Sequence, residues 1–90
     1  MKLKNEHLKQ LTEIKQYFLD PPHSFKLYSY AIPKAEEAMR IVEAYPKLHP
    51  MFLSMEQSLE QMKTLHTQPD LLRKAMIEFG RLFTYLNRHS

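Results

Sequence analysis

Residues 69–88 read PDLLRKAMIEFGRLFTYLNR and carry the clearest helical pattern in the chain. Apolar side chains recur in this stretch at intervals of three and four residues, as in an α-helix that packs along one face. The pattern predicts a helix over 70–88, about 28 Å long, opened by a capping box at 67–70. The expected buried seam consists of Leu72, Ala75, Phe79, Leu82 and Leu86, widened by Met76 and Phe83.

Two other segments, residues 4–19 and 50–66, show the same repeat. Proline is poorly tolerated inside helices but fits their first turn, so prolines mark helix boundaries. Pro21 and Pro22 close the first of these segments. Pro50 opens the other, although a capping box at Ser54 offers a later start. The expected buried faces are Leu3, His7, Leu8, Leu11, Ile14 and Phe18 in one, and Phe52, Met55, Leu59, Met62 and His66 in the other.

The segment around Pro33 allows three interpretations. Its apolar residues keep helical spacing without a break at the proline: Phe25, Tyr28, Ile32, Ala35, Met39 and Val42. This unbroken phase favours one helix over about 25–45, kinked at Pro33, over a new helix that begins at Pro33. Residues 25–30 are aromatic enough for a strand, but no other segment offers that strand a partner.

Four helical segments joined by short turns predict an all-α protein, a small up-down antiparallel four-helix bundle. The 90 residues suit a single domain, residues 1–90, with one core. Hydrophobic residues make up 43% and charged residues 26%, as in an ordinary globular domain. A single glycine argues against a fold built on hairpin turns.

Composition also argues against most enzyme classes. One glycine, Gly80, leaves no room for a phosphate-binding loop, a dinucleotide fingerprint or a nucleophile elbow. The lack of cysteine excludes disulfides, thiolate metal sites and a cysteine nucleophile. No stretch has the roughly 18 apolar residues of a membrane span, and residues 1–7 lack the apolar run of a signal peptide. We therefore expect a non-enzymatic protein without a cofactor or membrane contact, located in the cytoplasm.

The histidines are the candidates for metal binding. None forms the His-x-x-x-His or Glu-x-x-His pairs of helical metal sites. The predicted topology gathers them at the two ends of the bundle, with His7, His49 and His89 at one end, and His23 and His66 at the other with Asp20 and Asp70. Histidines at helix ends are usually solvated, so we expect no metal site.

A surplus of apolar residues is the one feature that points to a function. Burying one large apolar side chain stabilises a protein by about 1.5–3 kcal/mol, and several exposed together mark an interface. This predicts a protein-interaction module, such as a small regulator, inhibitor or adaptor, that binds another protein or itself as a homodimer. The candidate contact residues, which fall off the apolar stripes, are Leu27, Tyr30, Ile41, Ile77 and Tyr85.

The alternative hypothesis is nucleic-acid binding. The formal net charge is +3, and the last segment is clearly basic. Its candidate phosphate contacts are Arg73, Lys74, Arg81 and Arg88, set against Glu78. No aromatic residues are interleaved on that basic face for base stacking, which makes this alternative the weaker one.

Overall fold

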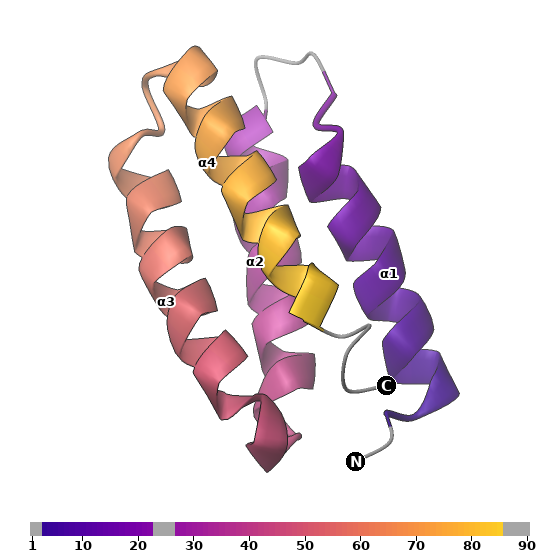
Figure 1. Ribbon diagram of the computed structural model, residues 1–90. Coiled ribbons are helices and arrows are strands. Elements are labelled where there is room, and N and C mark those ends of the chain that lie inside the picture. The colour runs from indigo at the N-terminus through magenta and orange to yellow at the C-terminus, as the bar shows by residue number, and fades with distance from the viewer. Residues whose placement is uncertain (1–2, 23–26, 86–90) are drawn as a thin grey trace.

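The computed structural model describes residues 3–22 and 27–85, apart from the side chains of Leu27 and Tyr85. Within these ranges the chain forms α-helices and short 3-10 turns, with no strand (Figure 1). The elements in chain order are α1 (Asn5–Leu19), α2 (Leu27–Glu43), the 3-10 turn η1 (Pro46–Leu48), α3 (His49–Thr64), α4 (Pro69–Arg81) and the 3-10 turn η2 (Leu82–Tyr85).

The helices run alternately up and down and close into a bundle of 38 × 21 × 19 Å (Figure 1). Each helix packs against the next one in the chain, and α4 packs back against α1. Across the diagonals of the bundle, α2 and α4 make a short contact. The described parts of α1 and α3 make no close backbone approach. The predicted all-α, up-down four-helix bundle is confirmed.

The helix α2 continues through Pro33. The proline removes the N–H that would bond to the carbonyl of Ser29 one turn earlier. Pro33 and Ser29 both lie on the exposed side of the helix, where water can satisfy that carbonyl. The single-helix interpretation is therefore confirmed. A helix start at Pro33 and a strand are both wrong for residues 27–32; residues 25 and 26 lie outside the described chain.

Prolines rather than capping boxes begin the later helices. Helix α3 begins at His49 with Pro50 in its first turn, so the alternative start at Ser54 is wrong. Helix α4 begins at Pro69, and no side chain caps its first turn, so the predicted capping box at 67–70 does not form. A proline at the first helical position supplies a preset helical φ, and its missing N–H would have had no partner within the helix.

The end of the last helix also differs from the prediction. The α-helix ends at Arg81 and tightens into η2, while residues 86–88 of the predicted helix lie outside the described chain. Leu82, expected in the buried seam, is only half-buried because it turns toward α3. Leu86 also lies outside the described residues. The rest of the predicted seam is buried: Leu72, Ala75, Met76, Phe79 and Phe83.

The buried stripe of α2 consists of smaller residues than the sequence predicted. Its fully buried positions are Ala31, Ala35, Ala38 and Val42. The larger Tyr28, Ile32 and Met39 are half-buried at the edge of the core. Alanine lets a helix approach its neighbours closely, whereas large side chains fit better in the grooves beside the contact line. Tyr28 illustrates this placement, because its ring lies 5.2 Å from the ring of His66 beyond the end of α3.

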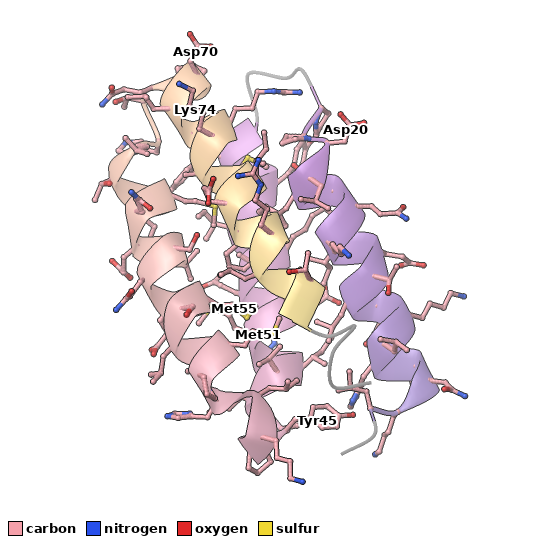
Figure 2. All side chains as sticks on the ribbon, viewed as in Figure 1. Asp20, Tyr45, Met51, Met55, Asp70 and Lys74 are labelled. Carbon is pink, nitrogen blue, oxygen red and sulfur yellow. The ribbon has the colours of Figure 1, made fainter. Side chains whose placement is uncertain are left out.

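The other two helices show smaller differences of the same kind. The core takes Leu11, Ile14 and Phe18 from α1 and Leu3 from the chain just before it, while His7 and Leu8 are half-buried. In α3 Met51 is buried and Phe52 is half-buried, the reverse of the prediction, and His66 is exposed. Figure 2 shows Met51 and Met55 pointing inward between the helices. In each case the helix is turned about its own axis by less than the angle between two successive residues. The neighbouring helices, not the segment's own sequence, determine this rotation.

Aromatic rings and one glycine define the contact between α1 and α4. The rings of Phe18 and Phe79 lie 4.6 Å apart, and the ring of Phe83 lies 5.6 Å from that of Phe79; both pairs are tilted. Gly80 is buried against α1: a Cβ there would lie 3.0 Å from Cδ2 of Leu19 and 3.1 Å from its backbone N. The single glycine is therefore a close-packing residue inside a helix, not a turn residue.

The contact at Gly80 leads to a stability prediction. Gly80→Val should lower the free energy of unfolding by about 1–3 kcal/mol, because the added side chain forces α4 away from the backbone of α1. This loss should occur although valine has a higher helix propensity than glycine. Chemical denaturation followed by circular dichroism measures it. The exposed Lys74→Val on the same helix is the control, and equal stabilities of the two variants would contradict the packing role of Gly80.

Candidate interaction surfaces

The structure distributes the predicted contact residues over two sides of the bundle. Tyr30 and Ile41 lie eleven residues apart on α2, which is three helical turns, so they share one stripe. Tyr30 is 53% exposed, while Ile41 packs against the core. Ile77 lies on α4, diagonally opposite α2. Leu27 begins α2 and Tyr85 ends η2, but their side chains lie outside the description.

Tyr30 belongs to a small aromatic cluster where α2 meets α1. The ammonium of Lys34 lies 4.9 Å from the ring centre of Tyr17, a cation–π contact. The hydroxyl of Tyr17 is buried and has no hydrogen-bond partner. Burial, together with the neighbouring Tyr30, raises the pKa of Tyr17 above its ordinary value of 10.0. The phenol therefore remains neutral and contributes its ring rather than a charge.

Tyr45 ties the opposite end of the bundle together. Its hydroxyl lies 2.6 Å from Nδ1 of His7 and accepts a hydrogen bond of 3.1 Å from the backbone N–H of Lys4. The tautomer of His7 sets the direction of the hydrogen bond between its Nδ1 and the hydroxyl, which has one donor and two acceptor positions. The two rings meet edge to face at 5.6 Å. His7 thus has a structural partner in Tyr45, which connects the start of α1 to the end of α2.

The predicted histidine groupings are present in part. His7 and His49 lie toward the end of the bundle where Figure 2 shows Tyr45. His66 lies at the other end, where the same view shows Asp20 and Asp70. Within the described residues, no three His, Asp or Glu side chains converge as metal ligands. His23 and His89 lie outside these residues.

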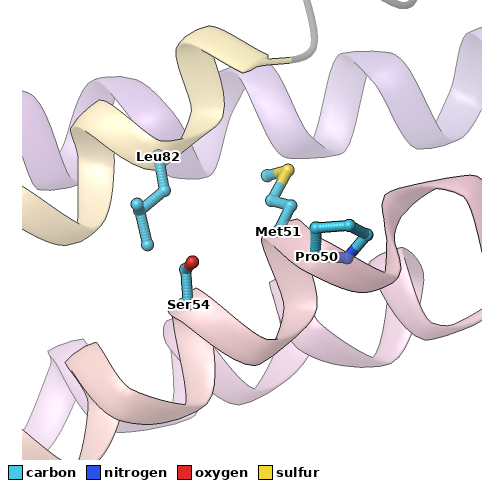
Figure 3. A pocket seen from close by; sticks show the side chains of 4 residues that line it. All are labelled: Pro50, Met51, Ser54 and Leu82. Atoms are coloured by element: carbon cyan, nitrogen blue, oxygen red, sulfur yellow. The ribbon is translucent and has the colours of Figure 1, made fainter.

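A groove between α3 and the end of α4 contains two adjoining hollows. The first, of about 140 Å³, is mainly apolar and is lined by Pro50, Met51, Ser54 and Leu82 (Figure 3). The second, of about 280 Å³, shares two of these residues and is lined by Ser54, Gln57, Ser58, Gln61, Glu78 and Leu82. Neither lining combines a nucleophile with a histidine base, and so the groove suits binding rather than nucleophilic catalysis.

The basic residues of α4 differ in their surroundings. Arg73 is half-buried and donates from Nη1 to the carbonyl of Pro22, 3.3 Å away at the end of α1. Arg81 pairs with Glu78 at 2.9 Å. Lys74 is exposed near the same end of the bundle as Asp20 and Asp70 (Figure 2). Arg88 lies outside the described residues.

Basic and apolar residues meet where α1 and α4 lie side by side. On α1, one stripe repeats at intervals of four, three and four residues; on α4, a second stripe repeats every four. The two stripes meet at the Leu19 end of α1, where Gly80 lies against Leu19 and Arg73 reaches Pro22 just beyond the helix. We call this surface the basic–apolar face, and its residues are Leu8, Thr12, Lys15, Leu19, Arg73, Ile77 and Arg81.

Apolar groups occupy the middle of the basic–apolar face. Leu19 is 37% exposed. Ile77 is half-buried but is not among the partly buried residues that pack against the core, unlike Leu8 and Ile41. The face therefore joins one predicted protein-contact residue, Ile77, to basic residues of the nucleic-acid hypothesis, Arg73 and Arg81.

Most acidic residues of α1 and α4 lie off this face, but Asp70 lies on the same side of α4 as Arg73, one helical turn before it. Helical spacing turns Glu6 and Glu13 away from the stripe on α1. Glu78 lines the groove toward α3, and Asp20 and Asp70 lie at the end of the bundle (Figure 2). The described part of the face thus carries an excess of positive charge.

Sequence reasoning missed the half of this face that α1 contributes. The interval pattern of Leu8, Thr12, Lys15 and Leu19 is visible in the sequence. This pattern indicates a joint surface only once α1 is known to lie beside α4. Each stripe alone is typical of the flank of any helix. The groove at Ser54 was missed for the same reason.

The class of protein is a small all-α four-helix bundle whose described helices are all too short or too polar to cross a membrane. No known family model matches the chain, and neither a curated protein nor a solved structure shows significant similarity to it.

The two partly buried tyrosines of α1 and of the α2–η1 junction should respond differently to loss of the hydroxyl. Tyr45→Phe removes bonds to His7 and Lys4 and should cost about 1–2 kcal/mol of unfolding free energy. Tyr17→Phe removes a hydroxyl that has no partner and should leave stability unchanged or slightly raised. Urea denaturation of both variants at neutral pH tests this. A larger loss in Tyr17→Phe than in Tyr45→Phe would contradict the hydrogen-bond assignment.

Tyr17 should also make the fold sensitive to alkali. Its pKa is raised in the folded protein, so its stabilising contribution is complete below the pKa of an unfolded tyrosine. That contribution is lost as the pH rises through the higher folded pKa. Between about pH 9 and pH 11 the wild type should lose more stability than Tyr17→Phe does. The free energy of unfolding of both proteins, measured as a function of pH, checks this. An equal loss in wild type and Tyr17→Phe would contradict a raised pKa of Tyr17.

Proposed function

We propose that this protein is a non-enzymatic interaction module that binds another protein through the basic–apolar face. The observation that carries the proposal is Ile77, an apolar side chain left off the core beside Leu19 and between Arg73 and Arg81. An apolar centre with a charged rim is the usual anatomy of a protein interface, and arginine is enriched there. A small regulator, inhibitor or adaptor would use such a face, and the lack of cysteine fits a reducing cytoplasm.

A symmetric homodimer through this face is disfavoured. In an isologous dimer the same patch meets itself, so Arg73 and Arg81 of one copy would face the same cations of the other. Like charges in contact oppose association. A different protein is therefore the better partner.

Nucleic-acid binding remains the second candidate, supported by Arg73, Lys74 and Arg81 on one helix. Phosphates would form ion pairs with these cations but would make no apolar contact with Leu19 or Ile77. The described part of the face also offers no aromatic ring on which a base could stack.

Site-specific crosslinking tests the proposal. A photoreactive amino acid placed at Ile77 in the full chain, expressed in the natural host, should crosslink to one identifiable protein. The same group at Glu37, exposed on α2, is the control. Once purified, that partner should bind Ile77→Ser about tenfold or more weakly than wild type, as expected for loss of an interface anchor. Equal crosslinking from both positions, or adducts to nucleic acid only, would overturn the proposal.

A further inference from the structure

We infer that two copies of this protein associate through the side of the bundle formed by α3 and α4, around a two-fold axis at the level of Met76. We call this side the groove face, because it contains the two hollows between these helices. Its main residues are Gln57 and Gln61 of α3 and Leu71, Lys74, Glu78 and Leu82 of α4 and η2. The inference goes beyond the proposed function and does not depend on it, since that function uses the basic–apolar face.

The flank of α4 that borders the groove is complementary to itself when two copies run antiparallel. Its residues follow at intervals of three and four: Leu71, Lys74, Glu78 and Leu82. Lys74 and Glu78 lie on opposite sides of Met76, two residues from it, and the two leucines lie five and six residues from it. A two-fold axis at Met76 therefore places Lys74 against Glu78 of the second copy, and the reverse. The same axis places Leu71 against Leu82 of the second copy.

The charges on the groove face balance, unlike those on the basic–apolar face. Within the described part of the chain, Lys74 is exposed and forms no ion pair, while Glu78 has one exposed partner, Arg81, at 2.9 Å. A carboxylate has room for a second donor. At the outer edge, Asp70 and Arg81 lie six and five residues from Met76, so the same axis also sets these opposite charges against each other. Opposite charges across an interface favour association and fix its register.

The flank of α3 that borders the groove is polar but uncharged. The residues with which it lines the hollow of about 280 Å³ are Ser54, Gln57, Ser58 and Gln61. Amides both donate and accept hydrogen bonds, so the glutamines of two copies can pair with one another. The hydroxyl of Ser58 is buried and has no hydrogen-bond partner among the described residues, and an amide that enters the hollow would satisfy it. Glu60 borders this flank, but its carboxylate is paired at 3.6 Å with the ammonium of Lys63.

The smaller hollow lies where the second copy would place an apolar side chain. It has a volume of about 140 Å³ and is lined by Pro50, Met51, Ser54 and Leu82 (Figure 3). Because the two-fold axis sets Leu71 against Leu82 of the other copy, Leu71 comes to the mouth of this hollow. Leu71 is 43% exposed in the single chain. Each copy would thus bury one leucine in the groove of the other, which favours association.

The size of the groove face indicates a weak dimer. Helix α3 spans 16 residues and α4 spans 13. The face is therefore about 20–24 Å long, and about 20 Å wide because packed helix axes lie about 8–10 Å apart. Such an area is near the lower limit of specific interfaces, so we expect a dissociation constant of roughly 10–100 µM.

Sedimentation velocity of the full chain tests the inference at concentrations from about 5 µM to about 1 mM, which bracket the expected affinity. The mass should rise from that of the monomer to that of the dimer. Lys74→Glu sets acid against acid and Glu78→Lys sets lysine against lysine, so each variant alone should dimerise at least about tenfold more weakly. An equimolar mixture of the two variants should regain about the wild-type affinity, because the acids of one copy then face the lysines of the other.

Matched controls lie on the opposite side of the bundle, on α1 and α2. Lys9→Glu and Glu37→Lys make the same charge changes at exposed positions there and should alter the dissociation constant less than about twofold. Leu71→Ser should weaken the dimer about tenfold or more. Tyr30→Ser removes an exposed aromatic side chain from α2 and should not weaken it. Circular dichroism verifies that each variant is folded.

A photoreactive amino acid at Leu71 identifies the occupant of the groove face, and its adducts should have twice the mass of the monomer. Adducts with a different protein only would overturn the inference. So would a wild type that stays monomeric at the highest concentration, a mixture of the two charge variants that stays monomeric, or equal effects of Leu71→Ser and Tyr30→Ser. The crosslink at Ile77 tests the proposed partner separately, because it reports on the other face.

Discussion

The close contact between α1 and α4 is the constraint on which the rest of the structure depends. It closes the bundle by joining its first and last helices, and it is possible because Gly80 has no side chain to hold Leu19 away. The rings of Phe18, Phe79 and Phe83 pack against one another beside that contact, tilted rather than stacked. A wider residue at position 80 would separate these rings, so one missing Cβ sets the distance at which the aromatic core can form.

The same contact creates the surface proposed to bind a partner. Leu19 packs against Gly80 and is still 37% exposed, and Ile77, one turn before Gly80, is half-buried without packing against the core. The cations on the two flanks are brought together by the same approach. The packing that stabilises the bundle thus produces a basic surface with an apolar middle, and this coupling explains why a stability residue, Gly80, lies directly beneath it.

The polar groups left without partners in the core are few and lie at its margins. Tyr17 keeps a buried hydroxyl that bonds to nothing, and Ser58 does the same beside the groove between α3 and α4. Tyr45 shows the contrasting case, in which one hydroxyl at the edge of the core forms hydrogen bonds with both Lys4 and His7 and so connects the start of α1 to the end of α2. A buried hydroxyl without a hydrogen bond lowers the stability of the fold, because it has lost its bonds to water. A hydrogen bond inside the protein offsets most of that loss. The groove and the tyrosine cluster are therefore places where the packing of this bundle is not optimised for stability alone.

The sequence by itself determined the helices and their order, because the three-and-four repeat and the position of each proline are local properties of the chain. It also favoured a single helix through Pro33, since the phase of the apolar residues is continuous there, and the structure has that helix. Only the tertiary structure decided which way each helix is turned, as the burial of Ala31 and Ala38 in place of Ile32 and Met39 shows. It alone also brought Gly80 against Leu19 and Arg73 to the carbonyl of Pro22, two pairs of residues that are more than fifty positions apart in the chain. Helix rotation and helix adjacency depend on the fit between distant side chains, and the period of a single segment carries no information about that fit.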